Sequence, residues 1–272
     1  MIRLLQSVKN ETHGKEHLSE ELEKTAPKYS KIQNVFKRSP ETKGIAPHLY
    51  GNEAIEYLMN ADWIVQEKID GTNTRIIWDG NRVSFGSKNT YGTDNIQGKL
   101  RIFLEENYGT PEFEQLIEQN FGDTPITIYG EGYGHKIQQG AGYFPESQEG
   151  RNDFIGFDVR VDGRYLSTTD TTDVLQKLGI RKVSELDGTM TIPDVIAAMI
   201  NAIDIAKEGT PAIVHAQTDK EIEGYVLRTA YPLYDHRGNR VLTKIILNDV
   251  RWVAENLRDE LPEWFGITPD LK

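Results

Sequence analysis

Residues 65–75 read VQEKIDGTNTR, a polar cluster between the apolar runs WIV and IIW. This arrangement predicts a strand, a tight turn and a second strand, with Gly71 supplying an unusual backbone angle at the turn. Lys68 would then lie where the first strand ends, flanked by Glu67 and Asp70. A lysine amine is nucleophilic when it is unprotonated, and partial desolvation favours that form. The stretch therefore predicts either a reactive lysine or an ordinary surface turn with solvated charges.

Length and composition restrict the class of protein. The chain has 272 residues and no cysteine, so it can form one large or two small domains but neither disulfides nor thiolate metal sites. No apolar run approaches the roughly 20 residues that a membrane-spanning helix needs, and the N-terminus lacks the apolar segment of a signal peptide. We therefore expect a cytoplasmic protein with no membrane partner. The net charge of −11 argues against general adhesion to nucleic acid, and it predicts weak, salt-sensitive affinity for a nucleic-acid substrate.

Apolar periodicity along the chain predicts a mixed, mainly antiparallel α+β fold. Turn residues between apolar runs predict two hairpins, across residues 79–81 and 162–163. Helices are expected at 96–106 and 111–120, after Thr191, and along the face formed by Val250, Val253, Leu257 and Leu261. Residues 28–47 are basic and interrupted by prolines, which predicts an irregular lead-in or a solvated loop.

Four charged residues stand in or beside strands that are otherwise apolar and aromatic: Lys68 in EKIDGTN, Glu131 in YGEG, Glu223 in EGYVL and Lys244 in LTKIIL. Charges in such positions are costly unless they converge and pair in one cleft. Two carboxylates and two lysines suit a nucleoside triphosphate with a divalent metal, because carboxylates hold the metal and lysines neutralise phosphate. The six histidines lack metal-ligand spacing and are expected on the solvated surface; they stand at positions 13, 17, 48, 135, 215 and 236.

In order and spacing, these motifs resemble those of the covalent nucleotidyltransferases, the ATP-dependent polynucleotide ligases and mRNA capping enzymes. The K-x-D-G sequence at Lys68 is similar to their motif I, and Glu131, Glu223 and Lys244 are similar to motifs III, IV and V. The longer form E-K-x-x-G-T-N is most similar to the RNA ligases typified by the phage enzyme that seals nicks in duplex RNA. The resemblance covers roughly residues 30–250. It implies a nucleotidyltransferase (ATP-grasp-like) domain whose sheets surround a nucleotide cleft.

The resemblance also implies a role for each matching residue. Lys68 would attack the α-phosphate of ATP, expel pyrophosphate and carry AMP on its amine, with Glu223 and Lys244 as catalytic partners. Glu131 and Glu223 would hold Mg²⁺ or Mn²⁺, and Glu131 is alternatively a ribose ligand. The nucleotide would be bound by Glu67 at the adenine amino group, Asn73 at a ribose hydroxyl, Lys88 at AMP or the RNA 5′-phosphate, Phe157 stacked on adenine, and Lys244 at the α-phosphate. Asp158 would support the site.

Each of these residues also has an ordinary interpretation. Glu131 could cap a turn between its two glycines, and Glu223 and Glu67 could be surface charges. Lys88 could be a solvated hairpin residue, and Phe157 could belong to the core.

The chain departs from the family pattern in two places. Motif V usually reads K-x-K, whereas Ile246 stands at the second lysine position, so one step is either slowed or supported by another residue. About 28 residues follow Lys244, too few for an OB-fold. We therefore expect an N-terminal lead-in at 1–60 that packs on the core, an adenylyltransferase (RNA ligase) domain at 61–250 and a C-terminal helix at 251–272. Binding of the RNA substrate would then depend on the core, the lead-in or a protein partner.

The sequence thus predicts an ATP-dependent RNA ligase that joins a 5′-phosphate to a 3′-hydroxyl, at a nick in duplex RNA, through a lysyl-AMP intermediate. A minimal DNA ligase and a GTP-dependent capping-type enzyme share the motifs and remain alternatives. A non-catalytic nucleotide- or RNA-binding module is the alternative of a different class, and Ile246 and the acidic charge favour it slightly.

Overall fold

A computed structural model describes residues 26–93, 96, 98–137, 142–144, 148, 150–208, 215 and 220–267. The chain divides into two units and passes between them several times. The first unit contains Gly71–Tyr133 and Asn152–Lys182, with Met1–Tyr29, and the second contains Ser30–Asp70, Gly134–Arg151 and Val183–Lys272. Lys68 therefore belongs to the second unit, close in sequence to the point where the chain enters the first.

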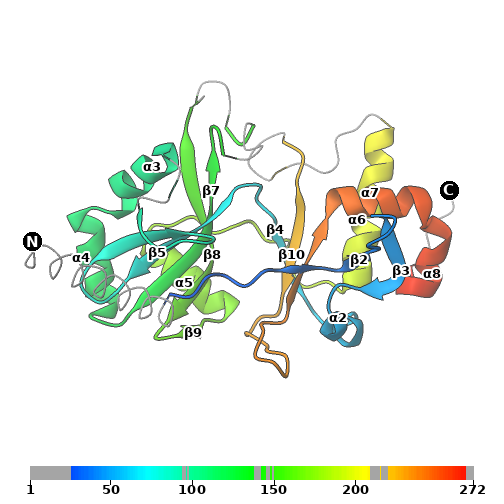
Figure 1. Cartoon of the computed structure of the whole chain (residues 1–272), viewed down its shortest axis with the longest axis horizontal. Helices are drawn as coiled ribbons and strands as arrows, with labels where there is room; N and C mark the ends of the chain where they lie inside the picture. Colours follow the sequence, from blue (N-terminus) through cyan, green and yellow to red (C-terminus); the bar gives the residue numbers. More distant parts are fainter. Residues whose placement is uncertain are drawn as a thin grey trace, which may run out of the picture. The chain divides into compact units, whose positions relative to one another are not determined.

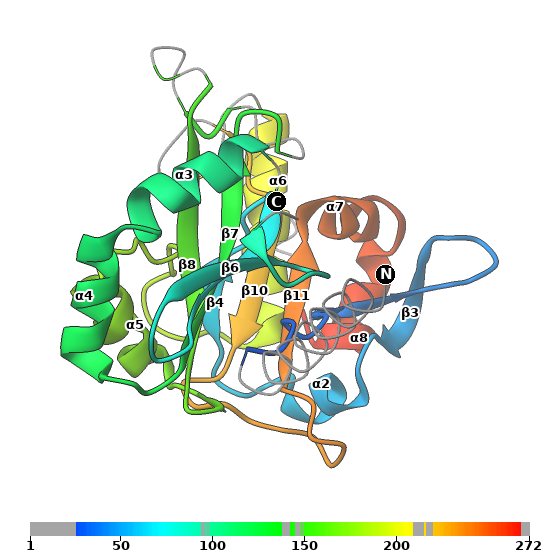
Figure 2. The ribbon, with the colours of Figure 1, turned by 60° about the vertical axis from the view of Figure 1, so that its left-hand side comes forward.

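The second unit is built on a four-stranded sheet in the order β1-β11-β10-β4, of which the last three strands are labelled in Figure 2. The strands are β1 (Gln33–Asn34), β4 (Ile64–Glu67), β10 (Gly224–Arg228) and β11 (Leu242–Ile246). β10 is antiparallel to both of its neighbours, whereas β1 runs parallel to β11 with Asn34 opposite Lys244. A strand from the N-terminal part of the chain thus extends a sheet formed by distant segments.

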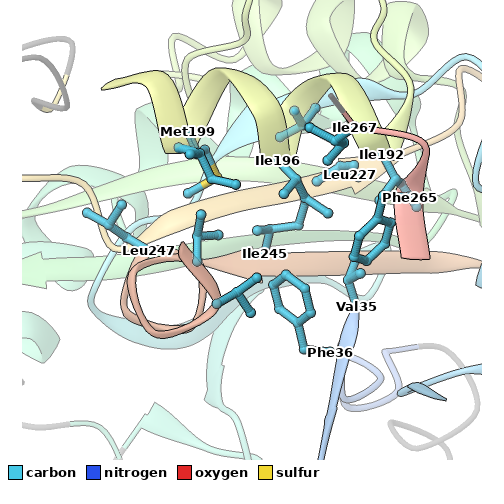
Figure 3. Close-up of a cluster of buried hydrophobic side chains, with 14 of the residues drawn as sticks. Val35, Phe36, Ile192, Ile196, Met199, Leu227, Ile245, Leu247, Phe265 and Ile267 are labelled. Carbon is cyan, nitrogen blue, oxygen red and sulfur yellow. The ribbon is translucent and has the colours of Figure 1, made fainter. Parts of the chain in front are cut away.

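The other elements of this unit are β2 (Phe36–Arg38) and β3 (Ile45–Tyr50), which pair with each other, α2 (Glu53–Leu58), α6 (Ile192–Lys207), α7 (Leu247–Asn256), the 3₁₀ helix η3 (Arg258–Glu260) and α8 (Leu261–Phe265). Thr191 is the N-cap of α6, and its side chain forms a capping box with Asp194. Ile196 and Met199 project from this helix into a hydrophobic cluster with Ile245 of β11 (Figure 3). The apolar face of α6 therefore packs on the sheet that carries Lys68.

Two expectations for this unit are wrong. Residues 28–47 are not an irregular lead-in, because they form β1, β2 and the start of β3, and Val35 and Phe36 are buried in the core. The final helix does not continue along one face to Leu261. It ends at Asn256, where Leu257 leaves the helical region with φ of −130°, and η3 and α8 follow.

The first unit contains a five-stranded sheet in the order β6-β5-β7-β8-β9, of which the last four strands are labelled in Figure 1. Its strands are β5 (Thr72–Trp78), β6 (Val83–Ser87), β7 (Ile126–Gly134), β8 (Asn152–Val161) and β9 (Arg164–Tyr165), and its helices are α3 (Gly98–Tyr108), α4 (Pro111–Phe121) and α5 (Thr168–Lys177). Both expected hairpins are present. Asp162 and Gly163 join β8 to β9 with φ values of 44° and 75°, the positive angles that a two-residue hairpin turn favours.

The turn around Lys68 differs from the expected one. β4 and β5 belong to different sheets, so the segment between them connects two sheets and does not close a hairpin. Gly71 does not have a positive φ, and the expected unusual angle is wrong. A close approach explains the glycine, because a Cβ at Gly71 would lie 2.5 Å from the carbonyl oxygen of Gly132.

The predicted fold class is confirmed, since helices accompany mainly antiparallel sheets and no closed barrel occurs in the described residues. Within the same residues, none of the helices combines the length and hydrophobicity needed to cross a bilayer. The division into 1–60, 61–250 and 251–272 stays a prediction. The two units cut across it, and residues 1–25 lie outside the described part.

Candidate functional site

Lys68 directly follows β4 and is held there by the neighbouring strand. Its backbone N–H donates to the carbonyl oxygen of Gly224 over 2.9 Å. Its Nζ lies 2.5 Å from Oε2 of Glu223, the residue before β10, and the two side chains are 21% and 32% exposed. Two of the three predicted catalytic residues are therefore in contact. At this exposure the ion pair adds little to stability, so its main physical effect is to orient the amine.

Lys68 just after β4, Gly224 on β10 and Ile246 on β11 lie opposite one another, in a row that crosses the sheet with Gly224 in the middle. Glu67 pairs with Tyr225, which places Lys68 opposite Gly224, and Gly224 pairs with Ile246 on its other side. A Cβ at Gly224 would lie 2.1 Å from the carbonyl oxygen of Ile245, and φ is +151°. The position is restricted to glycine, which leaves the sheet surface beside Lys68 without a side chain.

Lys244 lies on the same face of the sheet as Lys68, one row away. Val226 pairs with Lys244 on one side and with Gln66 on the other. Because side chains alternate along a strand, Gln66 and Lys68 share a face, and Lys244 and Ile246 share it with them. The sheet thus presents both predicted catalytic lysines on one surface.

Glu67 points to the opposite face and is buried. It is 7% exposed, and its Oε1 lies 3.4 Å from Nε2 of His215, which is 5% exposed. The interpretation of Glu67 as a surface charge is therefore wrong, and so is the expectation that His215 lies on the solvated surface. A buried carboxylate is retained at a cost in desolvation unless it has a polar partner, which His215 supplies here.

The turn after Lys68 is fixed by two residues that the sequence did not single out. Tyr143 Oη accepts a hydrogen bond from the backbone N–H of Asp70 at 2.7 Å. Lys220 Nζ lies 3.6 Å from Oδ2 of Asp70 and 3.9 Å from the centre of the Tyr143 ring. Burial lowers the pKa of Lys220, and the nearby Asp70 partly offsets this; burial also raises the pKa of Tyr143.

In the first unit, Asn73 on β5 lies directly opposite Glu131 on β7. Asn73 Oδ1 is buried and accepts no hydrogen bond from the described residues. A buried amide oxygen that has no donor is costly, so this atom fits a ligand hydroxyl such as that of a ribose. The glycines on either side of Glu131 have a packing role, because a Cβ there would meet the Phe154 ring at Gly130 and Leu100 at Gly132.

Lys88 is exposed in the loop that follows β6. Arg75, which is 0% exposed, holds this loop by donating to the carbonyl oxygens of Ser87 and Thr90 at 2.8 and 2.9 Å. Arg75 is thus a positioning residue that sequence analysis missed. Its only sequence signal was a cation directly before the apolar run Ile76-Ile77-Trp78.

Phe157 on β8 contacts Tyr29, with ring centres 5.0 Å apart in an edge-to-face arrangement. The buried Asp158 accepts a hydrogen bond from Tyr29 Oη at 2.9 Å. Phe157 is only partly buried, so part of its surface is still open to a ligand. Its stacking role stays a prediction.

The predicted metal ligands, Glu131 and Glu223, belong to different units. In the described part of the chain, no group of three or more His, Asp or Glu residues is arranged to hold a metal ion. Mg²⁺ is commonly held by one or two carboxylates together with substrate phosphates, so Glu223 beside Lys68 suits such an ion when a nucleotide accompanies it. The metal roles stay predictions.

Comparisons with known proteins identify the family of the chain and its fold. The model of a family described as RNA ligase matches residues 61–246. Among curated proteins, Protein Early 65 kDa of Autographa californica nuclear polyhedrosis virus is 35% identical over 79 residues, which are 29% of this chain and 14% of that protein.

Solved structures of Naegleria gruberi RNA ligase have the same fold. A mutant without ligand gives a TM-score of 0.53 at 15% identity, over 85% of this chain and 61% of that one. A mutant with ATP and Mn gives 0.53 at 14% identity, over 83% and 63%, and the ligase with PPi gives 0.52 at 14% identity, over 84% and 62%. The chain therefore spans about three fifths of the length of these ligases.

Proposed function

Because the chain belongs to the RNA ligase family, we propose that it is an ATP-dependent RNA ligase that works through a lysyl-AMP intermediate on Lys68. Lys68 Nζ bonds to the α-phosphorus of ATP, and the bond from that phosphorus to the β-phosphate oxygen breaks, so pyrophosphate leaves. An RNA 5′-phosphate oxygen then takes AMP from Lys68. Finally, a 3′-hydroxyl attacks that 5′-phosphate and AMP leaves, which completes the phosphodiester bond.

The observation that carries the proposal is the contact of Lys68 Nζ with Glu223 Oε2 at 2.5 Å. This contact lies at the edge of a sheet, and Lys244 lies on the same face of that sheet as Lys68. Nucleotidyl transfer depends on in-line positioning and charge neutralisation more than on proton transfer. Glu223 orients the attacking amine, and Lys244 supplies positive charge to the α-phosphate.

The remaining site residues would bind the nucleotide. Asn73 has a buried oxygen suited to a ribose hydroxyl, and Glu67 would contact the adenine amino group. The other proposed contacts are Lys88 with AMP or the 5′-phosphate, Phe157 with the adenine ring and Glu131 with the ribose or the metal.

ATP and a divalent cation are the proposed cofactors. Naegleria gruberi RNA ligase has been solved with ATP and Mn and with PPi, which supports this choice. A bound Mg²⁺ or Mn²⁺ would neutralise phosphate charge, and Glu131 and Glu223 are the proposed ligands. The substrate would be RNA with a 5′-phosphate and a 3′-hydroxyl, in the sealing of nicked duplexes during RNA repair.

The test is labelling with α-³²P-ATP or α-³²P-GTP and Mg²⁺, followed by denaturing electrophoresis. We expect acid-labile label from ATP on the wild-type protein and none on Lys68→Ala. The matched control is Lys177→Ala, which removes an exposed lysine of α5 that pairs with Asp173 and should label normally. Label from GTP alone would favour a capping-type enzyme.

The absence of label from both nucleotides, after bound AMP has been removed with pyrophosphate, would reject the enzyme and favour a binding module. The labelled protein is then given one of three substrates: a nicked RNA duplex, a nicked DNA duplex or single-stranded RNA with free ends. The rate of sealing of each identifies the substrate class. We expect the nicked RNA duplex to be sealed fastest. Preference for nicked DNA would instead favour the DNA ligase alternative.

A further inference from the structure

A pocket of about 660 Å³ opens on the second unit, within the size range of small-molecule sites. We call it the basic pocket and define it by Lys31, Lys37, Arg38, Lys244, Ile246 and Asp249. All of its lining residues belong to the second unit. The N-terminal strands β1 and β2 supply one wall, and the end of β11 with the start of α7 supplies another.

The charge exposed in the basic pocket is positive, although the chain as a whole carries −11. Its acidic residue, Asp249, has a side chain only 2% exposed and is paired with Arg38 and Asn34. Lys31 and Lys37 are exposed, and neither forms an ion pair within the described residues. The pocket therefore presents cations to a ligand while its one carboxylate is already neutralised.

The start of α7 adds to this preference for anions. α7 is ten residues long, and no side chain caps its first turn. Asn248 of that turn lines the basic pocket. The partial positive charge of a helix N-terminus favours phosphate groups.

The basic pocket shares a sheet face with the proposed nucleophile. Lys244 and Ile246 line the pocket, and they lie on the same face as Lys68. Gly224 alone separates Ile246 from Lys68 in their row, and it has no side chain. A phosphate chain attached at the α-phosphate beside Lys68 can therefore run over Gly224 toward the pocket.

We propose that the basic pocket binds the diphosphate portion of ATP and the pyrophosphate that leaves it, with Lys31 and Lys37 supplying the charge that Ile246 lacks. The inference rests on the proposed function and assigns residues outside the family match, which begins at residue 61. It explains how a chain with one lysine in motif V neutralises its leaving group.

The test separates the step that releases pyrophosphate from the step that does not involve it. The double variant Lys31→Ala/Lys37→Ala should raise the KM for ATP in lysyl-AMP formation. It should also raise the pyrophosphate concentration at which half of the lysyl-AMP is converted back to ATP. At least about a tenfold change is expected, the size typical of lost charge-assisted hydrogen bonds. Sealing of a pre-adenylylated RNA by AMP-free protein should change less than twofold, since no pyrophosphate takes part.

Two further variants make the result specific. Lys99→Ala/Lys177→Ala removes two exposed lysines of the other unit and should leave every step unchanged. Ile246→Lys, added to the pocket double variant, should restore pyrophosphate affinity because it returns a cation to the pocket. Urea midpoints for each protein show whether folding is intact.

The proposal is overturned if the pyrophosphate concentration for half-reversal in the double variant stays within twofold of the wild-type value. A parallel loss in sealing of pre-adenylylated RNA also overturns it and would make the pocket an RNA contact. If the wild-type protein forms no lysyl-AMP, the proposed function fails independently. Calorimetric titration of Lys68→Ala with pyrophosphate, with and without the two alanines, then decides on the pocket itself.

Discussion

Gly224 follows Glu223 and has φ of +151°, a backbone angle that other residues rarely adopt. Its neighbour Ile245 adds a second restriction, because a Cβ would lie 2.1 Å from that carbonyl oxygen. Gly238 provides a matched position with φ of +78° and open space around it. An alanine at Gly238 would therefore introduce backbone strain alone, whereas an alanine at Gly224 would introduce both backbone strain and steric overlap.

We expect Gly224→Ala to lower the free energy of unfolding by about 3 kcal/mol or more, and Gly238→Ala by about 1 kcal/mol. Urea denaturation of the two variants and the wild type measures the difference. Equal losses would show that the overlap at Gly224 relaxes without cost, contrary to this prediction.

Lys220 gives a prediction for pH. Burial lowers the pKa of Lys220 in the folded protein below 10.5, and the negative charges of Asp70 and Glu223 partly offset this effect. Burial also raises the pKa of the neighbouring Tyr143. Between the pKa of Lys220 in the folded protein and its higher pKa in the unfolded chain, the unfolded chain binds more protons. The contribution of Lys220 to the free energy of unfolding therefore grows as pH rises toward 10.5. The difference in unfolding free energy between wild type and Lys220→Met should therefore shift in favour of wild type from pH 7 to 10. Urea titrations at several pH values measure it, and a shift in the other direction contradicts the prediction.

At the scale of elements, local signals predicted helices and hairpins well. The helix expected after Thr191 is α6, which begins at Ile192 with Thr191 as its N-cap. Asp162-Gly163 placed the hairpin of β8 and β9. Such signals act over a few residues, so they survive without knowledge of the rest of the chain.

The capping box of α6 can be tested directly. Thr191 Oγ1 accepts a hydrogen bond from the backbone N–H of Asp194 at 3.2 Å. We expect Thr191→Ala to lower the free energy of unfolding by about 1 kcal/mol, and Thr191→Ser to change it by a few tenths at most. Urea denaturation distinguishes them, and a serine variant as unstable as the alanine variant would argue against the cap.

Pairing between elements was harder to predict. β1 joins β11 across some 200 residues of sequence, and its two residues carry no strand pattern of their own. Buried Val35 and Phe36 were hidden among basic residues and prolines in a segment that resembled a loop. Long-range pairing and packing override local propensity at such places.

At the scale of the whole molecule, net charge sets the conditions for binding RNA. A chain of net charge −11 repels a polyanion except at basic patches. We expect the logarithm of RNA affinity to fall linearly with the logarithm of salt concentration. With about three phosphate contacts, affinity would fall about twentyfold to fortyfold between 50 and 200 mM salt. Fluorescence anisotropy with a labelled RNA measures the slope, and affinity independent of salt would contradict an electrostatic mode of binding.

The sequence by itself determined the α+β class and the main helices and hairpins, and it singled out Lys68, Glu223 and Lys244 as candidate site residues, because periodicity, caps and motifs are local. Only the tertiary structure decided that Glu67 is buried against His215, that Tyr143 and Lys220 hold the turn after Lys68, and that Lys31 and Lys37 share a pocket with Ile246. Those contacts join residues far apart in the sequence. Their free energy comes from packing and desolvation of the assembled chain, which no short segment contains.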